Sequence, residues 1–314
     1  MVSVTDKKTG TTSKELLDTE QWLTALAGQR TPEDVALIRR ACAVAEQAHA
    51  GQLRASGEPY VQHALAVANI LVGLQLDAET LAAAVLHDVV EDTEFTLKQI
   101  EKDFGPQVAK LVDGVTKMEL IQHWHSGGDS GKRELRQAET LRKMLLAMAD
   151  DVRVVLIKLA DRTHNMRTLD YLPADKQQRI ADETLAIYAP LANRLGIWHI
   201  KWELEDLSFR HLHPDRYKQI ARMLNERRID RERYINQFMK ILNDALTQAG
   251  VRAEVTGRPK HIYSIWRKMS RKNVDYSQIY DVRAVRVLVD EVLDCYAALG
   301  IIHGKIFARG VRPC

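Results

Sequence analysis

Apolar residues recur every three to four positions along most of the chain before Gly250, and this periodicity predicts amphipathic helices. No strand-like alternation is found in that part of the sequence. We therefore expect the fold class to be mainly α, with an all-helical domain over residues 31–200 and a helical linker over 201–250. A polar N-terminal segment is predicted at residues 1–30.

Turn and capping residues predict where these helices begin and end. Thr31 before Pro32 is typical of a helix start, and Gly51 is typical of the end of the same helix. Thr96 to Gln99 has the sequence of a capping box, and the helix that it opens is expected to stop at Gly105. Further helices are predicted over residues 63–73, 78–90, 107–118, 134–149, 152–169, 174–195, 198–212 and 217–250.

The pattern changes after Gly250. VRAEVTG and DVRAVRVLVD alternate as strands do, while GRPKHIYSIWRKMSRK and EVLDCYAALGIIH have helical spacing. This order predicts the β-α-β-α beginning of a second, mixed α/β domain over residues 251–314. Two strands leave sheet edges without partners, so we expect the chain to end before this domain is complete.

Composition narrows the class of protein. The 314 residues are enough for two domains, and the net charge of +3 gives no general attraction to nucleic acid or acidic membranes. No apolar run reaches the ~18 residues that a membrane-spanning helix needs. Three cysteines without CxxC spacing fit a reducing compartment, so a cytoplasmic protein is expected. In ERRIDRERY the arginines alternate with acids, which indicates ion pairs on a solvated helix and opposes nucleic-acid binding.

The stretch LAAAVLHDVVEDT carries the candidate chemistry. Its apolar run ends in two polar pairs, His87-Asp88 and Glu91-Asp92. On one continuous helix His87 lies a turn from Glu91, and Asp88 lies a turn from Asp92. Carboxylates crowded at the negative end of a helix repel one another, and a bound cation would offset that cost. We interpret this stretch as half of a metal site.

Two other stretches complete the predicted site. RASGEPYVQH delivers His63 to the start of a helix, and KLADRTHNMRT carries Asp161, Asn165 and Thr168 on one helical face. Two imidazoles with two carboxylates suit a divalent ion of borderline hardness such as manganese, and they differ from a closed structural zinc site. Each element alone also has a simpler explanation, because a single histidine is often only structural and an acidic pair at a helix end is often solvated.

The order of these residues, H…HD…D, resembles the HD superfamily of metal-dependent phosphohydrolases. The longer strings RASGEPYVQHALAVA, LHDVVEDT, GVTKM, KLADRTHNMRTL and YAPLANRLGIWHIKWELEDLSF are similar to the N-terminal half of the RelA/SpoT homologues, the enzymes of the bacterial alarmone (p)ppGpp. GRPKHIYSIWRKM and YDVRAVRVLVD resemble the opening of that family's synthetase domain. The resemblance runs from about residue 30 to about residue 303.

The resemblance implies a role for each candidate residue of the first domain, and a reaction that removes pyrophosphate from the 3′ position of (p)ppGpp in the stringent response. Four residues are implied ligands of manganese: His63, His87, Asp88 and Asp161. Two are implied to orient and deprotonate the attacking water: Glu91 and Asp92. Four are implied to hold the substrate: Arg54 and Ser56 at its guanosine end, and Asn165 and Thr168 on its ribose and phosphate side.

For the second domain the resemblance implies a nucleotide-binding turn and helix followed by a Mg²⁺ site, at these positions: Arg258, Lys260, His261, Ser264, Lys268 and Asp281. That family's synthetase also needs a glutamate and a guanine-stacking tyrosine, both of which would lie beyond residue 314. We therefore expect a (p)ppGpp hydrolase without pyrophosphokinase activity. The alternatives are a GTP pyrophosphokinase, as in the family, and a regulatory fragment that binds guanine nucleotides without turnover.

Overall fold

The fold was analysed in a computed structural model, which describes residues 17–123, 150–226, 228–258, 261–275 and 284–306, together with positions 142 and 146. The described chain is mainly helical, as predicted, and it divides between Leu212 and His213 into two compact units. The predicted domain boundaries at residues 30, 200 and 250 stay predictions. None of the described helices combines the length and the apolar character needed to cross a lipid bilayer.

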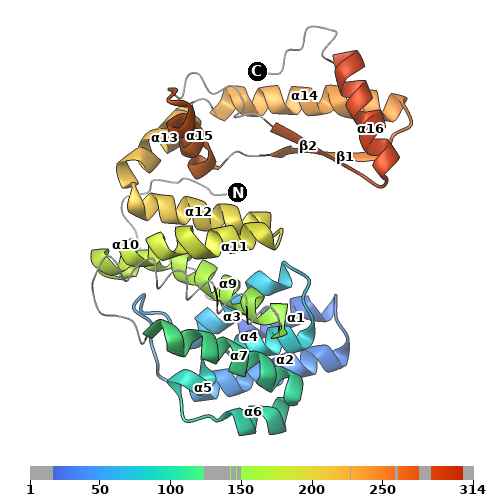
Figure 1. The fold of residues 1–314 in the computed structure, drawn as a ribbon. Coiled ribbons are helices and arrows are strands. Elements are labelled where there is room, and N and C mark those ends of the chain that lie inside the picture. Colours follow the sequence, from blue (N-terminus) through green and yellow to red (C-terminus); the bar gives the residue numbers. More distant parts are fainter. Residues whose placement is uncertain are drawn as a thin grey trace. The chain divides into compact units, whose positions relative to one another are not determined.

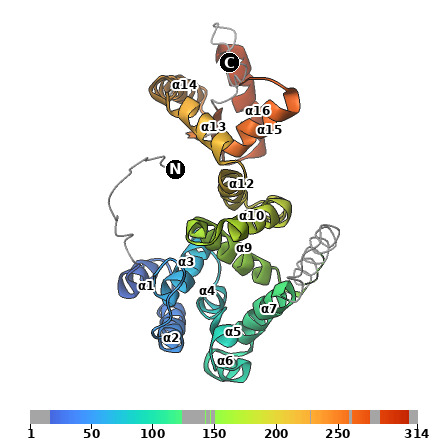
Figure 2. The same ribbon diagram turned by 90° about the vertical axis from the view of Figure 1, so that its left-hand side faces the viewer.

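In its described residues the first unit is built from helices, joined by loops of which one holds a single β-bridge between Leu53 and Pro59 (Figures 1 and 2). In chain order these are α1 (Thr19–Ala27), α2 (Pro32–Ala48), α3 (Tyr60–Val72), α4 (Ala78–Val85), α5 (Val89–Asp92), α6 (Leu97–Phe104), α7 (Pro106–His123), α9 (Val152–Arg167), α10 (Ala174–Glu183), α11 (Ala189–Arg194) and α12 (Trp198–Leu212). A 3-10 turn (Leu169–Tyr171) precedes α10, and a π-helical turn (Thr184–Tyr188) joins α10 to α11, where one continuous helix was predicted.

Helix α9 lies at the centre of this unit, packed against α3, α4, α7 and α12 (Figure 1). Its residues from Ile157 to His164 are all buried. Gly114 of α7 allows the close approach of α7, because a Cβ atom there would lie 2.7 Å from a methyl carbon of Val154. Polar side chains on such a central helix need partners inside the core, since an unpaired buried polar group is costly.

The helix starts follow the predicted capping chemistry. The Thr31 side chain accepts a hydrogen bond from the backbone N–H of Asp34, and Thr96 forms a complete capping box with Gln99. Helix α2 ends at Ala48, three residues before the predicted Gly51, which lies in the following turn with a φ of 78°. Helix α1, inside the range predicted as a polar segment, contributes buried residues to the core: Trp22, Leu23 and Leu26.

The prediction of one continuous helix over residues 78–90 is wrong. Helix α4 ends at Val85, and α5 begins only at Val89. His87 lies in the break, and its Nδ1 is 2.8 Å from the carbonyl oxygen of Ala84. The imidazole thus satisfies a carbonyl that a continuing helix would have bonded to a backbone N–H, and the helical relation between His87 and Glu91 is lost.

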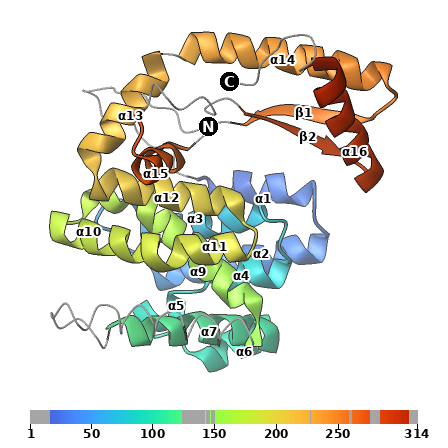
Figure 3. The same cartoon turned by 45° about the horizontal axis from the view of Figure 1, so that its top comes forward.

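The second unit combines helices with two strands (Figure 3). Its elements are α13 (Pro214–Glu226), α14 (Arg228–Gln248), β1 (Ala253–Arg258), α15 (Ile262–Lys272), β2 (Ala284–Val289) and α16 (Val292–Ile301), followed by a π-helical turn (Ile302–Ile306). The strands pair antiparallel, with Ala253 opposite Val289. Helix α14 packs on this pair, and Gly257 of β1 leaves room for Ile235 of α14. The helix predicted over 134–149 falls almost wholly outside the described residues.

Candidate metal centre

Three side chains that are far apart in sequence converge in the core of the first unit. His63 comes from the first turn of α3, His87 from the break after α4, and Asp161 from the middle of α9. All three are buried, and one donor atom from each lies within 4.8 Å of the others. His63 Nε2 is 3.3 Å from Asp161 Oδ1. The convergence of His87 and Asp161, on which the predicted site depends, is therefore present.

Asp88 stands at the edge of the same cluster. Its Oδ1 is 3.0 Å from His87 Nε2, and its Oδ2 is 3.7 Å from His63 Nε2. The four predicted metal ligands are thus neighbours, although their role as ligands stays a prediction. Two imidazole nitrogens and two carboxylates form a donor set suited to a divalent transition-metal ion.

The imidazole of His87 fits a metal ligand in a specific way. Nδ1 is bonded to the Ala84 carbonyl, which leaves Nε2 pointing into the cluster. Nε2 is buried and has no hydrogen-bond partner of good geometry among the described residues. Burial opposes a charged ring, but the Asp88 carboxylate outweighs it and raises the pKa of His87 to about 9. A cation bound beside Nε2 would replace that proton, since a metal-ligating imidazole must be neutral.

The pKa values of His63 and Asp88 are both lowered, which leaves the imidazole neutral and the carboxyl group charged. Burial lowers the pKa of His63, so its ring is neutral at neutral pH, as a metal ligand must be. Burial alone would raise the pKa of Asp88, but the neighbouring His87 more than offsets it, and the pKa lies well below its usual range. Asp88 therefore stays a carboxylate throughout the physiological range.

Lys158 is a component of the site that the sequence analysis did not single out. Its ammonium is almost completely buried and lies 2.9 Å from Asp161 Oδ2. Together with the two histidines it outweighs the effect of burial and holds the pKa of Asp161 well below the ordinary value. Because Lys158 occupies Oδ2, the other oxygen of Asp161 is the one that faces His63. Its spacing of three residues before Asp161 was the available signal.

Tyr60 connects the predicted ligands to the predicted general bases, and it too was missed. Its hydroxyl lies 2.8 Å from Asp88 Oδ2 and 2.7 Å from Asp92 Oδ2. The ring stacks on His49 at 4.4 Å, which fixes its position. Glu91 precedes Asp92 on the short helix α5, with its Oε2 buried. Asp92 is therefore linked to the cluster through the phenol of Tyr60.

The predicted substrate residues divide into two groups. Arg54 donates to Asn165 Oδ1 at 2.6 Å, and Asn165 donates in turn to Asp161 Oδ1 at 2.6 Å, so these two border the cluster. Ser56 instead donates to Glu58 in its own loop at 3.4 Å. The buried hydroxyl of Thr168 donates to the carbonyl of His164 at 3.2 Å, at the end of α9.

The positions predicted for nucleotide binding in the second unit are only partly described. Ser264 and Lys268 lie one turn apart on α15, and His261 immediately precedes that helix. Arg258 ends β1. Lys260 and Asp281 lie outside the described residues.

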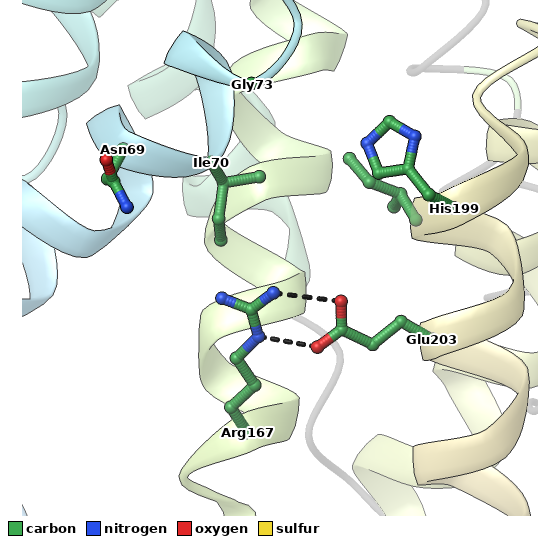
Figure 4. Close-up of a pocket in the computed structure, with 7 residues that line it drawn as sticks. Asn69, Ile70, Gly73, Arg167, His199 and Glu203 are labelled. Carbon is green, nitrogen blue, oxygen red and sulfur yellow. Dashed lines mark hydrogen bonds and ion pairs between the residues drawn. The ribbon is translucent and has the colours of Figure 1, made fainter. Parts of the chain in front are cut away.

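A separate pocket of about 380 Å³ opens between α3, α9 and α12 (Figure 4). Its lining includes Asn69, His199 and the ion pair of Arg167 with Glu203. Two hydrogen bonds of 2.6 and 2.9 Å join the guanidinium of Arg167 to the carboxylate of Glu203, so each charge has a partner. No predicted site residue lines this pocket.

Comparison with known proteins matches both parts of the chain. An HD domain model matches residues 41–198, just over half of the chain, and a model for a region found in RelA/SpoT proteins matches residues 257–310. A GTP pyrophosphokinase of Streptomyces coelicolor is 51% identical over 85% of this chain and 31% of its own length. A guanosine-3′,5′-bis(diphosphate) 3′-pyrophosphohydrolase of Haemophilus influenzae is 49% identical over 86% of this chain and 39% of its own.

A solved structure of a metazoan SpoT orthologue, described as hydrolysing ppGpp, is 27% identical, and the match covers 57% of this chain and 96% of that one with a TM-score of 0.43. The chain spans 31% to 39% of the length of the two curated relatives. The matches to the HD domain and to the following region nevertheless agree with the order of motifs in the sequence. The chain belongs to the RelA/SpoT homologue family, with an HD domain preceding the region found in RelA/SpoT proteins.

Proposed function

We propose that the first unit hydrolyses (p)ppGpp at its 3′ position, with manganese as the metal, to give GDP or GTP and pyrophosphate. The observation that carries the proposal is the convergence of two imidazoles and two carboxylates: His63, His87 and Asp161 are buried together, and Asp88 borders them. The activity named for the Haemophilus relative supports the choice of substrate. An HD domain over residues 41–198 supports metal-dependent phosphate chemistry.

The residues around the cluster have two roles in this proposal, metal binding and proton transfer. The cation would be held by four side chains: His63, His87, Asp88 and Asp161. A bound divalent ion would supply Lewis acidity to a water molecule and to the phosphate oxygens. Glu91 and Asp92, next to the cluster on α5, are the groups that accept the proton of the attacking water. Water attacks the phosphorus attached to O3′, and the bond from that phosphorus to O3′ breaks.

Arg54 is the cation best placed for the substrate. Its guanidinium already reaches Asn165, whose amide contacts Asp161, so it borders the cluster from the loop side. A planar guanidinium can bind two phosphate oxygens at once or stack on a base. We assign the guanosine end of the substrate to Arg54 and Ser56, and its ribose and phosphates to the side of Asn165 and Thr168.

The test is hydrolysis of ppGpp by the purified chain. With Mn²⁺ we expect GDP and pyrophosphate in equal amounts, and we expect EDTA to abolish the reaction. In ¹⁸O-labelled water the label should appear in pyrophosphate and not in GDP. Asp88→Ala and Glu91→Ala should each lower kcat by about 10²-fold or more, while the pocket variant His199→Phe should keep it. Binding of ppGpp without release of pyrophosphate would favour the regulatory alternative. Full turnover by Asp88→Ala would refute the site.

A second candidate activity is the pyrophosphokinase named for the Streptomyces relative. The match to the RelA/SpoT region and the placement of Ser264 and Lys268 on one face of α15 favour nucleotide contact by the second unit. The test is to incubate the Asp88→Ala variant with ATP, GDP and Mg²⁺, because this variant should not hydrolyse any product. Formation of ppGpp would establish the activity.

A further inference from the structure

His63 and His87 each have one ring nitrogen that faces the cluster and a second one that faces away from the cluster. For His87 this is Nδ1, bonded to the backbone carbonyl of Ala84. For His63 it is also Nδ1, which lies 2.7 Å from Nδ1 of His164. His164 follows Asp161 on α9 and is buried. The orientation of the His87 ring is thus fixed by the backbone. The orientation of the His63 ring is fixed by the side chain of His164, which mutation can replace.

The neighbours of His164 determine where the proton of this contact lies. Two imidazole nitrogens 2.7 Å apart must share one proton, so one donates and the other accepts. Arg54 also contacts Nδ1 of His164, through a guanidinium nitrogen at 3.4 Å. A guanidinium can only donate. Nδ1 of His164 is therefore the acceptor in both contacts, and Nδ1 of His63 carries the proton.

This proton assignment has a direct consequence for the other nitrogen of His63. A neutral imidazole with its proton on Nδ1 has a lone pair on Nε2. That Nε2 lies 3.3 Å from Asp161 Oδ1 and 3.7 Å from Asp88 Oδ2. A lone pair that faces two carboxylates is repelled unless a cation lies between them. The tautomer set by His164 is therefore the one that a metal ligand needs.

We propose that His164 is a positioning residue that fixes the Nδ1–H tautomer of His63 before any ion arrives, and so presents Nε2 to a divalent cation. The inference rests on the metal centre of the proposed function and adds a residue to it. It also explains why a second histidine is buried against the first, where an apolar residue would fill the space at lower cost.

The test compares variants that keep or remove an acceptor at this point. His164→Asn places an amide oxygen near the position of Nδ1, whereas His164→Phe keeps a planar ring without an acceptor. We expect the Kd for Mn²⁺, measured by electron paramagnetic resonance, to rise about 10- to 100-fold in His164→Phe. His164→Asn should stay close to the original chain, as should the matched control His199→Phe on the surface.

A second readout does not need the metal. In the metal-free chain labelled with ¹⁵N-histidine, His63 should be the Nδ1–H tautomer, and in His164→Phe it should change to Nε2–H. If His164→Phe does not fold, as judged by circular dichroism, His164→Gln serves instead, because its amide lies near the Nε2 position. An Nε2–H tautomer in the original chain, or unchanged Mn²⁺ binding in a folded variant without the acceptor, would overturn the inference. Absence of Mn²⁺ binding by the original chain would instead refute the metal centre itself.

Discussion

The two units of this chain differ in how much core surrounds their polar groups. In the first unit a continuous helical core encloses a fully paired ammonium and carboxylate, Lys158 and Asp161, both almost inaccessible to solvent. In the second unit the described buried apolar residues are fewer: Leu242, Leu246 and Ala298 form one small cluster, and Ile220, Ala221, Ile262 and Ile265 of α13 and α15 are also buried. Apolar side chains of α16 stay exposed there, with Leu293 75% exposed. A charged site can be held rigidly only where enough packed core surrounds it, and only the first unit offers this among the described residues.

Helix capping differs from helix to helix. Five helices of the first unit begin with a side chain that accepts a backbone N–H: Asp18, Thr31, Asp77, Thr96 and Asp151. Helices α3, α5 and α10 of the same unit begin without such a bond, and so do α15 and α16 of the second unit within the described structure. Each cap typically contributes about 1 kcal/mol. Capping therefore adds local stability to five helices of the first unit.

The largest effect is expected from breaking the buried ion pair. Asp161→Ala leaves the ammonium of Lys158 buried without its carboxylate, and it should lower the free energy of unfolding of the first unit by about 3–5 kcal/mol. The measurement is urea denaturation followed by circular dichroism, without added metal. The double variant Lys158→Met with Asp161→Leu should regain most of the loss, since an apolar pair of similar volume needs no charge partner. If Asp161→Ala lowered the free energy of unfolding by only about 1 kcal/mol, as for an exposed ion pair, water would have to reach this pair.

A matched pair of cavity variants tests the comparison directly. Leu86 and Leu246 are both buried, the first in the large core and the second in the small one. Leu86→Ala should cost about 4 kcal/mol, and Leu246→Ala about 2 kcal/mol, because partly exposed neighbours can collapse into the smaller cavity. Each variant should shift a different transition in a calorimetric melt. One shared transition that shifts equally for both would mean that the two units unfold as a single cooperative body.

The smallest effect concerns the guanidinium of Arg153, which joins two helix caps. It lies 2.7 Å from Asp151 and 3.2 Å from Asp77. Arg153→Leu should cost about 1 kcal/mol at neutral pH, since the Asp77 carboxylate is partly exposed and solvent screens it. Hydrogen bonds from Arg153 lower the pKa of Asp151. For Asp77, burial acts in the opposite direction but is outweighed by hydrogen bonds from Thr80 and Arg153.

The sign of the pH dependence follows from those shifts. Carboxyl groups with a lowered pKa stabilise the fold above their ordinary value of 3.8, and this stability is lost as the pH falls through the lower folded-state pKa. The difference between the original chain and Arg153→Leu should therefore be full at neutral pH and vanish in strong acid. Urea titrations at several pH values measure it. A difference that persists at the lowest pH would assign the effect to packing of the arginine stem.

The sequence was sufficient for the helical class, for the caps at Thr31 and Thr96, and for choosing residues that converge, because each depends on local spacing or on a motif. It was insufficient for the break at His87, where a side chain replaces a backbone N–H as the partner of Ala84. The spacing of apolar residues does not show whether a side chain will replace a backbone N–H as a hydrogen-bond partner. The resulting turn is what lets His87 and Asp88 face the same cluster.

The partners of the cluster were also beyond local reasoning. Tyr60 and His164 lie more than one hundred residues apart, and each contacts the cluster only because α3 and α9 pack together. Lys158 stands on the same helix as Asp161, but an ammonium is normally expected at the surface. Its burial depends on the core that surrounds α9, and so on tertiary packing. Long-range contacts of this kind are set by the whole fold and leave no periodic trace in the sequence.

The bridge made by Arg153 has a consequence for transplanting the site. His87 follows Asp77 by ten residues, and Asp161 follows Asp151 by ten residues. One guanidinium therefore joins the starts of two of the three segments that carry the predicted ligands, while His63 comes from α3. Along α9 this link lies about 15 Å from Asp161. A designer who grafts only the four ligands onto another helical scaffold would leave this link behind and would need another restraint on the spacing of the two segments.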